Sequence, residues 1–201
     1  MNRFLMSVET VKIKDFIFST NKLKLIRGAS YLLDYLNQVE IPAILEKYKI
    51  ESDNIASDIK KLYKEEAPNS KILIAFKEVA FNGIESTGDE KLWDSIDKLA
   101  DKIAIEKSKG FPIVNIDLPF VKKCPLCENN PVLVSTKNLE EDLLKLNITG
   151  DKKKDFYNNL DIDELKNQIE ILTDRNGYIC EECLKKLIYS MQIKAKKSGK
   201  D

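Results

Sequence analysis

The sequence predicts an α+β protein in two parts, a small domain of strands and helices and a helical module rich in cysteine. Short apolar runs that suit buried strands alternate with stretches whose apolar residues recur every three or four positions, as in amphipathic helices. All four cysteines fall in the second half of the chain. The 201 residues are 43% apolar and 33% charged, which is typical of a folded chain.

The first part should begin with a strand and two helices. An apolar run at Arg3–Val8 suits a buried strand, and apolar residues at 23–36 then mark one face of a helix. This helix should stop or kink near Ile41-Pro42, because proline disfavours a helical conformation in the residue before it. A second amphipathic helix is expected around 55–63, and a turn at 67–70 should follow it.

The next segments should complete a sheet. Residues 71–84 are interpreted as a tight hairpin that turns at Lys77-Glu78, and the alternative is one long strand. A helix should follow from a capping box that starts at Thr87, and Trp93 on its apolar face is assigned to the core. A last strand is expected at 111–116.

The order of these elements divides the chain into three regions. Apart from one extra helix, residues 1–118 follow the order β-α-β-β-α-β, which is the ferredoxin-like arrangement. Residues 119–190 contain the cysteines, with two helices between the cysteine pairs and a C-terminal helix that begins near Glu181. Residues 191–201 are expected to form a frayed, lysine-rich tail.

The composition excludes several classes of function. The chain has no histidine, so it cannot hold a His-dependent metal centre, a His–Asp phosphohydrolase site, or a Ser–His or Cys–His dyad. No apolar run approaches the ~20 residues of a membrane span, and Glu9 comes too early for a signal peptide, so we expect a cytoplasmic protein. The 33 basic and 33 acidic residues balance, which leaves no global attraction to nucleic acid or membrane.

The cysteines form two pairs with the same spacing, Cys124-Pro125-Leu126-Cys127 and Cys180-Glu181-Glu182-Cys183. Two residues between thiolates allow a tight turn that aims both sulfurs at one point, with backbone N–H groups offsetting their charge. Two such turns supply a tetrahedral four-sulfur shell, which favours structural Zn²⁺. Residues 128–179 separate the pairs, far more than the ~15–20 residues of a compact ribbon, so we expect a zinc ribbon with a helical insertion.

Other uses of the four cysteines stay open at this point. They could form disulfides, although these fit a cytosolic chain poorly, or a redox dithiol or an iron–sulfur site. A catalytic zinc is not expected, because four thiolates leave no coordination position for water. The expected site therefore holds two chain segments together and performs no chemistry.

Three stretches together carry a family resemblance. Lys14-Asp15-Phe16-Ile17 follows the first strand, and Arg27-Gly28-Ala29-Ser30-Tyr31-Leu32-Leu33 lies in the next helix. The four-cysteine insert is preceded by Leu118-Pro119-Phe120 and ends in Cys183-Leu184-Lys185-Lys186. In these motifs and their order, nearly the whole chain resembles the large subunit of type III CRISPR effector complexes. The resemblance implies the first palm domain of that subunit, followed by its zinc module.

The resemblance also implies a role. The family's second palm carries Gly-Gly-Asp-Asp, whose carboxylates hold the divalent metals that convert ATP into cyclic oligoadenylates. This sequence has no Gly-Gly pair, so we expect a non-catalytic subunit or fragment of an antiviral effector. It would act as a scaffold and form part of a nucleotide pocket, with ATP and Mg²⁺ bound only beside a partner palm. Other effector subunits are the implied partners, and RNA would be contacted through the complex.

Four residues are the candidates for nucleotide contact, namely Arg27, Gly28, Ser30 and Glu9. Arg27 could bind phosphate oxygens, and Gly28 would permit close approach of the backbone. The alternative is a solvated basic stripe in which Gly28 and Ser30 provide a small packing face. Glu9 stands at the end of the first strand, where palm polymerases place a metal-binding carboxylate, but Glu78 is the only further acid on the hairpin.

The competing hypothesis is an autonomous zinc-binding adaptor that binds RNA, DNA or protein through the helical insertion and the lysine-rich tail. A degraded gene fragment is a third interpretation, and an exposed apolar sheet face would be expected for it.

Overall fold

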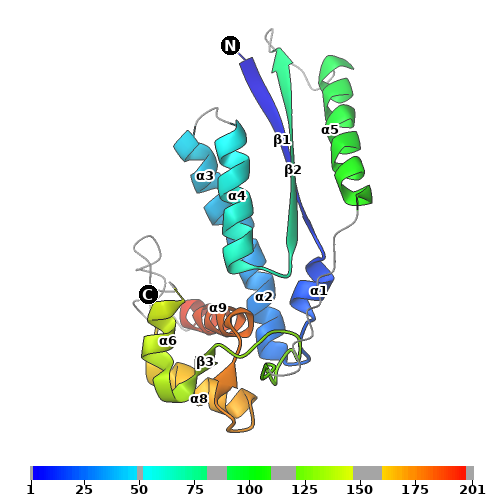
Figure 1. Cartoon of the computed structure of the whole chain (residues 1–201). Coiled ribbons are helices and arrows are strands. Elements are labelled where there is room, and N and C mark those ends of the chain that lie inside the picture. Colours follow the sequence, from blue (N-terminus) through cyan, green and yellow to red (C-terminus); the bar gives the residue numbers. More distant parts are fainter. Residues whose placement is uncertain (1, 49–51, 81–89, 110–120, 147–159, 198–201) are drawn as a thin grey trace. The chain divides into compact units, whose positions relative to one another are not determined.

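A computed structural model describes residues 2–48, 52–80, 90–109, 121–146 and 160–197 (Figure 1). Over these residues the protein is mixed α+β, with small antiparallel sheets and a cluster of four cysteines. It divides into two compact units, one of Met1–Ile13 with Tyr35–Ile116 and one of Lys14–Asp34 with Asp117–Asp201. Residues 14–34 thus group with the cysteine module, whereas the sequence analysis places them in the region 1–118.

The first unit is built on a pair of long antiparallel strands. β1 (Asn2–Val11) pairs with β2 (Lys71–Ala80) over the whole length of both strands. The predicted first strand is confirmed and extends three residues beyond Val8, to Val11. Each face of the pair is lined by alternate residues of the two strands, so each face can receive its own helix.

The hairpin predicted at 71–84 is wrong for the described part of that segment. Lys77 and Glu78 lie inside β2, opposite Leu5 and Phe4 of β1. Pairing with β1 keeps every residue of β2 extended, and neither Lys77 nor Glu78 is a residue type that favours a tight turn. The long-strand alternative is therefore correct for residues 71–80, and Asn82-Gly83 lies outside the described residues.

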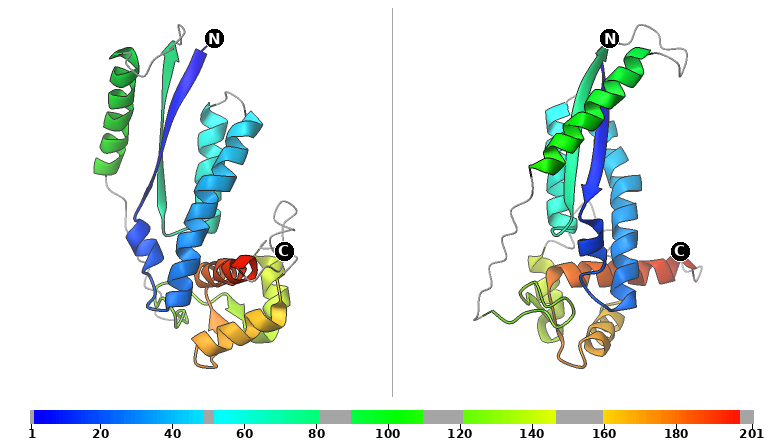
Figure 2. Two further views of the ribbon diagram at one scale, coloured as in Figure 1. Left: turned by 180° about the vertical axis from the view of Figure 1, so that it is seen from behind. Right: turned by 90° about the vertical axis from the view of Figure 1, so that its right-hand side faces the viewer.

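Helices cover both faces of this strand pair, as the views in Figure 2 show. α5 (Glu90–Ser108) packs Leu99 and Ile103 against the face that carries Leu73 and Ala75. α4 (Ser52–Glu66) lies on the other face, where the Tyr63 hydroxyl shares a 3.1 Å hydrogen bond with Thr10. The Tyr63 hydroxyl donates its single proton to Asn37 Oδ1 at 2.6 Å. Its oxygen therefore accepts the hydrogen bond from the Thr10 hydroxyl.

The ferredoxin-like arrangement is not shown by this unit. A ferredoxin-like fold has four strands and carries its helices on one face, whereas the described residues of this unit (2–13, 35–48, 52–80 and 90–109) contain two strands with a helix on either face. The strand predicted at 111–116 and the capping box at Thr87 lie outside the described residues.

The predicted irregularity before Pro42 is a π-helical stretch. η1 (Leu36–Glu40) directly precedes α3 (Ile41–Tyr48), and the Ile41 N–H bonds to the Leu36 carbonyl. Proline has no N–H for the helical ladder, so the regular bonding pattern is interrupted near Pro42, and the helical path continues through η1 into α3 without stopping.

The assignment of Trp93 to the core is wrong, because its side chain is 55% exposed. The buried residues of α5 are Ser95, Leu99 and Ile103, which are spaced four apart and form one face. Trp93 lies two positions before Ser95, about 200° around the helix, and therefore leaves that face.

The second unit contains the cysteine module and five helices of the described chain. It holds α1 (Ile13–Ile17) and most of α2 (Leu23–Tyr35), followed by β3 (Val134–Ser135), a 3₁₀ turn η2 (Thr136–Asn138), α6 (Leu139–Lys145), α8 (Ile162–Leu172), β4 (Tyr178–Ile179) and α9 (Glu181–Lys197). The predicted helices between the cysteine pairs and after Glu181 are confirmed. α9 continues to Lys197, so the region predicted as a frayed tail begins as helix. Among the described helices, none has the length and apolar character needed to cross a membrane.

Gly28 lets α2 approach α9 closely in this unit. A Cβ atom on Gly28 would lie 1.7 Å from the Lys186 carbonyl oxygen and 2.7 Å from its carbon, which is inside the backbone of α9. The absence of a side chain at Gly28 therefore serves helix packing.

Substitution of Gly28 by alanine should destabilise the second unit. The gain in helix propensity, ~1 kcal/mol, is outweighed because α9 must move away, and overpacking typically costs about 1–3 kcal/mol. Chemical denaturation followed by circular dichroism measures the change. Ser30→Ala is the control, because Ser30 is exposed on the same helix and its hydroxyl donates to the Ile26 carbonyl. Equal stability of the two variants would contradict this account of the helix contact.

Candidate metal centre

The four cysteine sulfurs converge in the core of the second unit. Their Sγ atoms all lie within 4.8 Å of one another, and all four residues are buried. The Sγ atoms of Cys127 and Cys180 are 3.7 Å apart, too far for a disulfide, whose S–S bond is about 2.05 Å. A tetrahedral zinc site with Zn–S bonds of about 2.3 Å separates its sulfurs by about 3.8 Å. The cluster is therefore compatible with a metal ion such as zinc.

Local backbone geometry forms the first cysteine pair. The Cys124 N–H donates to the Asn130 carbonyl at 2.9 Å, and the Glu128 N–H donates to the Cys124 carbonyl at 2.8 Å. Glu128 adopts a left-handed conformation with φ of 57°, which reverses the chain directly after Cys127. These bonds close a compact loop with both thiols on its inner side.

The second cysteine pair lies where β4 meets α9. Cys180 directly follows the strand, and Cys183 lies in the first turn of the helix. The Cys183 N–H donates to Cys180 Sγ at 3.4 Å. This bond is the expected backbone donor to a thiolate, and it stabilises negative charge on Cys180.

The crowded sulfurs change one another's acidity. Hydrogen bonds from Cys127, then Cys180 and Cys183, lower the pKa of Cys124. The contact with Cys124 raises the pKa of Cys127, but the hydrogen bonds from Cys180 and Cys183 outweigh this effect. The net result is a lowered pKa of about 6 for Cys127. The pKa values of Cys180 and Cys183 are raised, chiefly by Cys124 and Cys127 and also by burial. A metal ion that binds all four thiolates must therefore displace protons held by Cys180 and Cys183.

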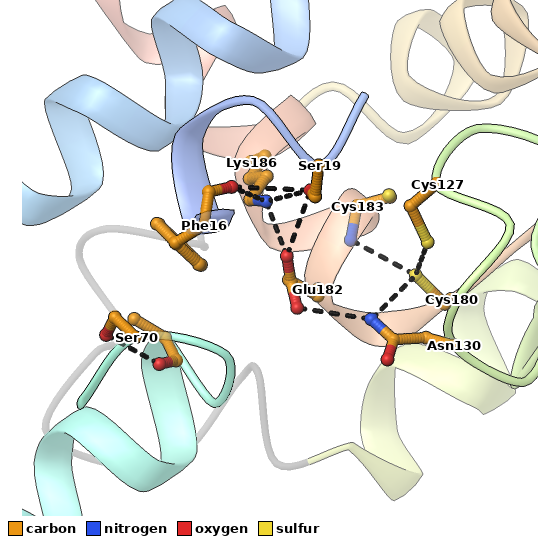
Figure 3. Close-up of polar contacts among 10 residues, drawn as sticks. Phe16, Ser19, Ser70, Cys127, Asn130, Cys180, Glu182, Cys183 and Lys186 are labelled. Atoms are coloured by element: carbon orange, nitrogen blue, oxygen red, sulfur yellow. Dashed lines mark hydrogen bonds and ion pairs between the residues drawn. The ribbon is translucent and has the colours of Figure 1, made fainter. Parts of the chain in front are cut away.

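A buried polar network continues from the cysteines (Figure 3). The Asn130 amide Nδ2 lies 4.0 Å from Cys180 Sγ and donates to Glu182 Oε2 at 3.1 Å. The other carboxylate oxygen of Glu182 pairs with Lys186 Nζ at 2.5 Å. Both members of this ion pair are buried, with side chains 2% and 0% exposed, so each charge depends on the other for compensation.

Lys186 connects this network to the segment before α2. Its Nζ donates to the Phe16 carbonyl at 2.5 Å and to Ser19 Oγ at 2.8 Å, and it lies 4.1 Å from the centre of the Phe16 ring. Phe16 is itself fully buried. The Lys14-Asp15-Phe16-Ile17 motif is thus anchored on α9, the helix that carries Cys183. Lys186, Glu182 and Asn130 connect it to the sulfurs.

The candidate nucleotide residues lie in different settings. Arg27 and Ser30 are exposed on α2, whereas Gly28 is buried, and the close approach that it permits in this structure is to α9. Glu9 lies in the first unit, where its carboxylate pairs with Lys107 at 2.5 Å. Nucleotide contact by Arg27, Gly28, Ser30 and Glu9 stays a prediction.

Asn130, Glu182 and Lys186 form the polar network beside the cysteines, and the sequence analysis missed all three. A signal for two of them existed, because Glu182 and Lys186 are four apart and surrounded by residues expected to be buried, such as Cys183 and Leu187. An ion pair at this spacing usually faces solvent, so the sequence did not indicate its burial. No local pattern links Asn130 to Glu182, which lies 52 positions further along the chain.

Comparison with models of protein families found none that matches this chain, and a search of curated proteins found no match.

Proposed function

We propose that this protein is a non-catalytic scaffold whose four cysteines bind one structural Zn²⁺ ion. The observation that carries the proposal is the convergence of four buried sulfurs within 4.8 Å, connected through Asn130 and Glu182 to Lys186. Thiolates are the ligands of structural zinc sites, and a complete set of four excludes a reactive water. The ion would join the 121–133 loop to the start of α9.

We further propose that the scaffold serves in a type III CRISPR-like antiviral effector as a first palm with its zinc module. The support is the sequence resemblance, together with the anchoring of Phe16 on Lys186, which gives one resembling motif a structural role. The proposed partner carries a Gly-Gly-Asp-Asp palm, and ATP with Mg²⁺ would bind only in the joint assembly. Arg27 and Ser30, exposed on α2, are the residues available for nucleotide contact in this proposal.

Incubation with radiolabelled ATP and Mg²⁺ or Mn²⁺ tests whether the chain can join nucleotides without a partner palm. The purified chain alone should form no linked nucleotide product, because it lacks the acidic pair that holds catalytic metals. A complex co-purified with a Gly-Gly-Asp-Asp palm protein from a neighbouring gene should convert ATP into linked products. Arg27→Ala should reduce the rate of that conversion.

Product formation by the solitary chain would contradict the non-catalytic role. Failure of any such palm protein to co-purify would contradict the effector assignment and leave the zinc scaffold standing. Salt-dependent RNA binding by the chain alone would favour the autonomous adaptor instead, since phosphate contacts release counterions.

A further inference from the structure

The outer edge of β2 forms a groove in the first unit. β1 occupies one edge of β2, and within the described residues no strand occupies the other. Two hollows of about 490 and about 250 Å³ lie along β2, and Lys60 and Ile72 line both of them. Together the two hollows follow β2 from Ala75 back to Lys71, and they are called here the β2 edge groove.

The two helices bound this groove from opposite sides. α4 lies over one face of the strand pair and contributes Lys60, and α5 lies over the other and contributes Ile105, which is 57% exposed. An extended segment placed beside β2 would therefore direct alternate side chains toward α4 and α5. Backbone groups on an open strand edge supply hydrogen bonds for such a segment.

The charges that line the groove are mostly positive. Four lysines contribute, namely Lys60, Lys64, Lys71 and Lys102, against the carboxylate of Glu106. Lys102 already donates to a backbone acceptor of β2, the Phe76 carbonyl, at 3.0 Å. Lysines at a strand edge discourage pairing with a second copy of the same basic edge, and they complement carboxylates on a different chain.

We propose that the β2 edge groove binds an extended, acidic segment of a partner protein, which adds to β2 as a strand. The backbone edge at Ile72–Ala75 provides affinity, and the lysines select a segment in which acidic and β-branched residues alternate. A two-stranded sheet gains stability from a third strand, which favours this mode of binding. The proposal goes beyond the scaffold role and does not depend on the metal cluster or on the effector assignment.

The test uses the full chain and a fluorescent, end-blocked peptide of eight residues in which glutamate and valine alternate. Fluorescence anisotropy should show saturable binding, and hydrogen exchange should show new protection of those amides in 71–76 that do not bond β1. A matched peptide with lysine in place of glutamate should not bind. Lys60→Glu and Lys102→Glu should each weaken binding about tenfold or more, because they place like charges against the peptide.

Neighbouring lysines outside the groove provide controls of equal charge change. Lys61→Glu on α4 and Lys98→Glu on α5 should leave the affinity within about twofold, as expected for charges away from the contact. Equal binding of both peptides, or equal losses in all four variants, would overturn the proposal. Protection, before peptide is added, of those amides in 71–76 that do not bond β1 would also overturn it, since the chain itself or a second copy would then cover the edge.

Discussion

Cys183→Ala should release the metal ion and unfold the second unit of this protein. Cys183 is fully buried among the other three sulfurs, so its loss removes one ligand and leaves a hole in the core. Structural zinc contributes about 10–16 kcal/mol of apparent binding free energy in small domains, comparable to the ~5–15 kcal/mol stability of a whole domain. Native mass spectrometry measures the metal, and hydrogen exchange of residues 121–146 and 160–192 measures the loss of structure.

Ser190→Ala is the matched control for this prediction. Ser190 is buried on the same helix, and its hydroxyl has no hydrogen-bond partner within the described residues. Its replacement removes a polar atom from the core and should leave both metal content and exchange unchanged. A Cys183→Ala chain that stays as protected as the Ser190→Ala chain would show that the cluster does not stabilise the unit.

Lys186→Met should destabilise the second unit strongly while the four cysteine ligands remain in place. The change leaves the buried Glu182 carboxylate without its cation, and removing one partner of a buried ion pair typically costs about 3–5 kcal/mol. It also removes the donor to the Phe16 carbonyl, so segment 14–19 should exchange its amides faster. Urea denaturation measures the free energy of unfolding.

Two further variants make this result interpretable. The double variant Lys186→Met with Glu182→Gln removes both charges and should recover part of the loss. Lys145→Met breaks the ion pairs of Lys145, whose side chain is 64% exposed, with Glu141 and Asp142, and it should have little effect on the free energy of unfolding. A Lys186→Met chain as stable as the Lys145→Met chain would contradict the structural role of the network.

The four-cysteine cluster could be predicted from sequence because its information is local. Each cysteine pair brings two sulfurs together within one turn, and cysteine has few other uses in that spacing. The helices around the cluster were predictable for a similar reason, since their apolar periodicity lies within each segment. Residues 128–179 separate the two cysteine pairs. Their convergence could be predicted only because a complete tetrahedral shell needs four ligands.

The errors and omissions arise where a distant segment decides the outcome. The local polarity of Lys77 and Glu78 indicates a turn, whereas pairing with the distant strand β1 keeps both residues extended. Trp93 lies about 200° around α5 from Ser95, outside the buried face, and only the sheet determines which side of that helix is covered. Lys186 is buried because Phe16 and Ser19 reach it from 170 and 167 positions earlier in the chain.

The most direct measurement is the intact mass of the full chain, purified under reducing conditions and sprayed from a native buffer. The mass should exceed that of the polypeptide by one zinc ion less the two protons that a doubly charged ion replaces, and a strong chelator should return it to the metal-free value. A chain that carries no stoichiometric metal, or one whose mass reports hydrogens lost to disulfide bonds, would contradict the central claim.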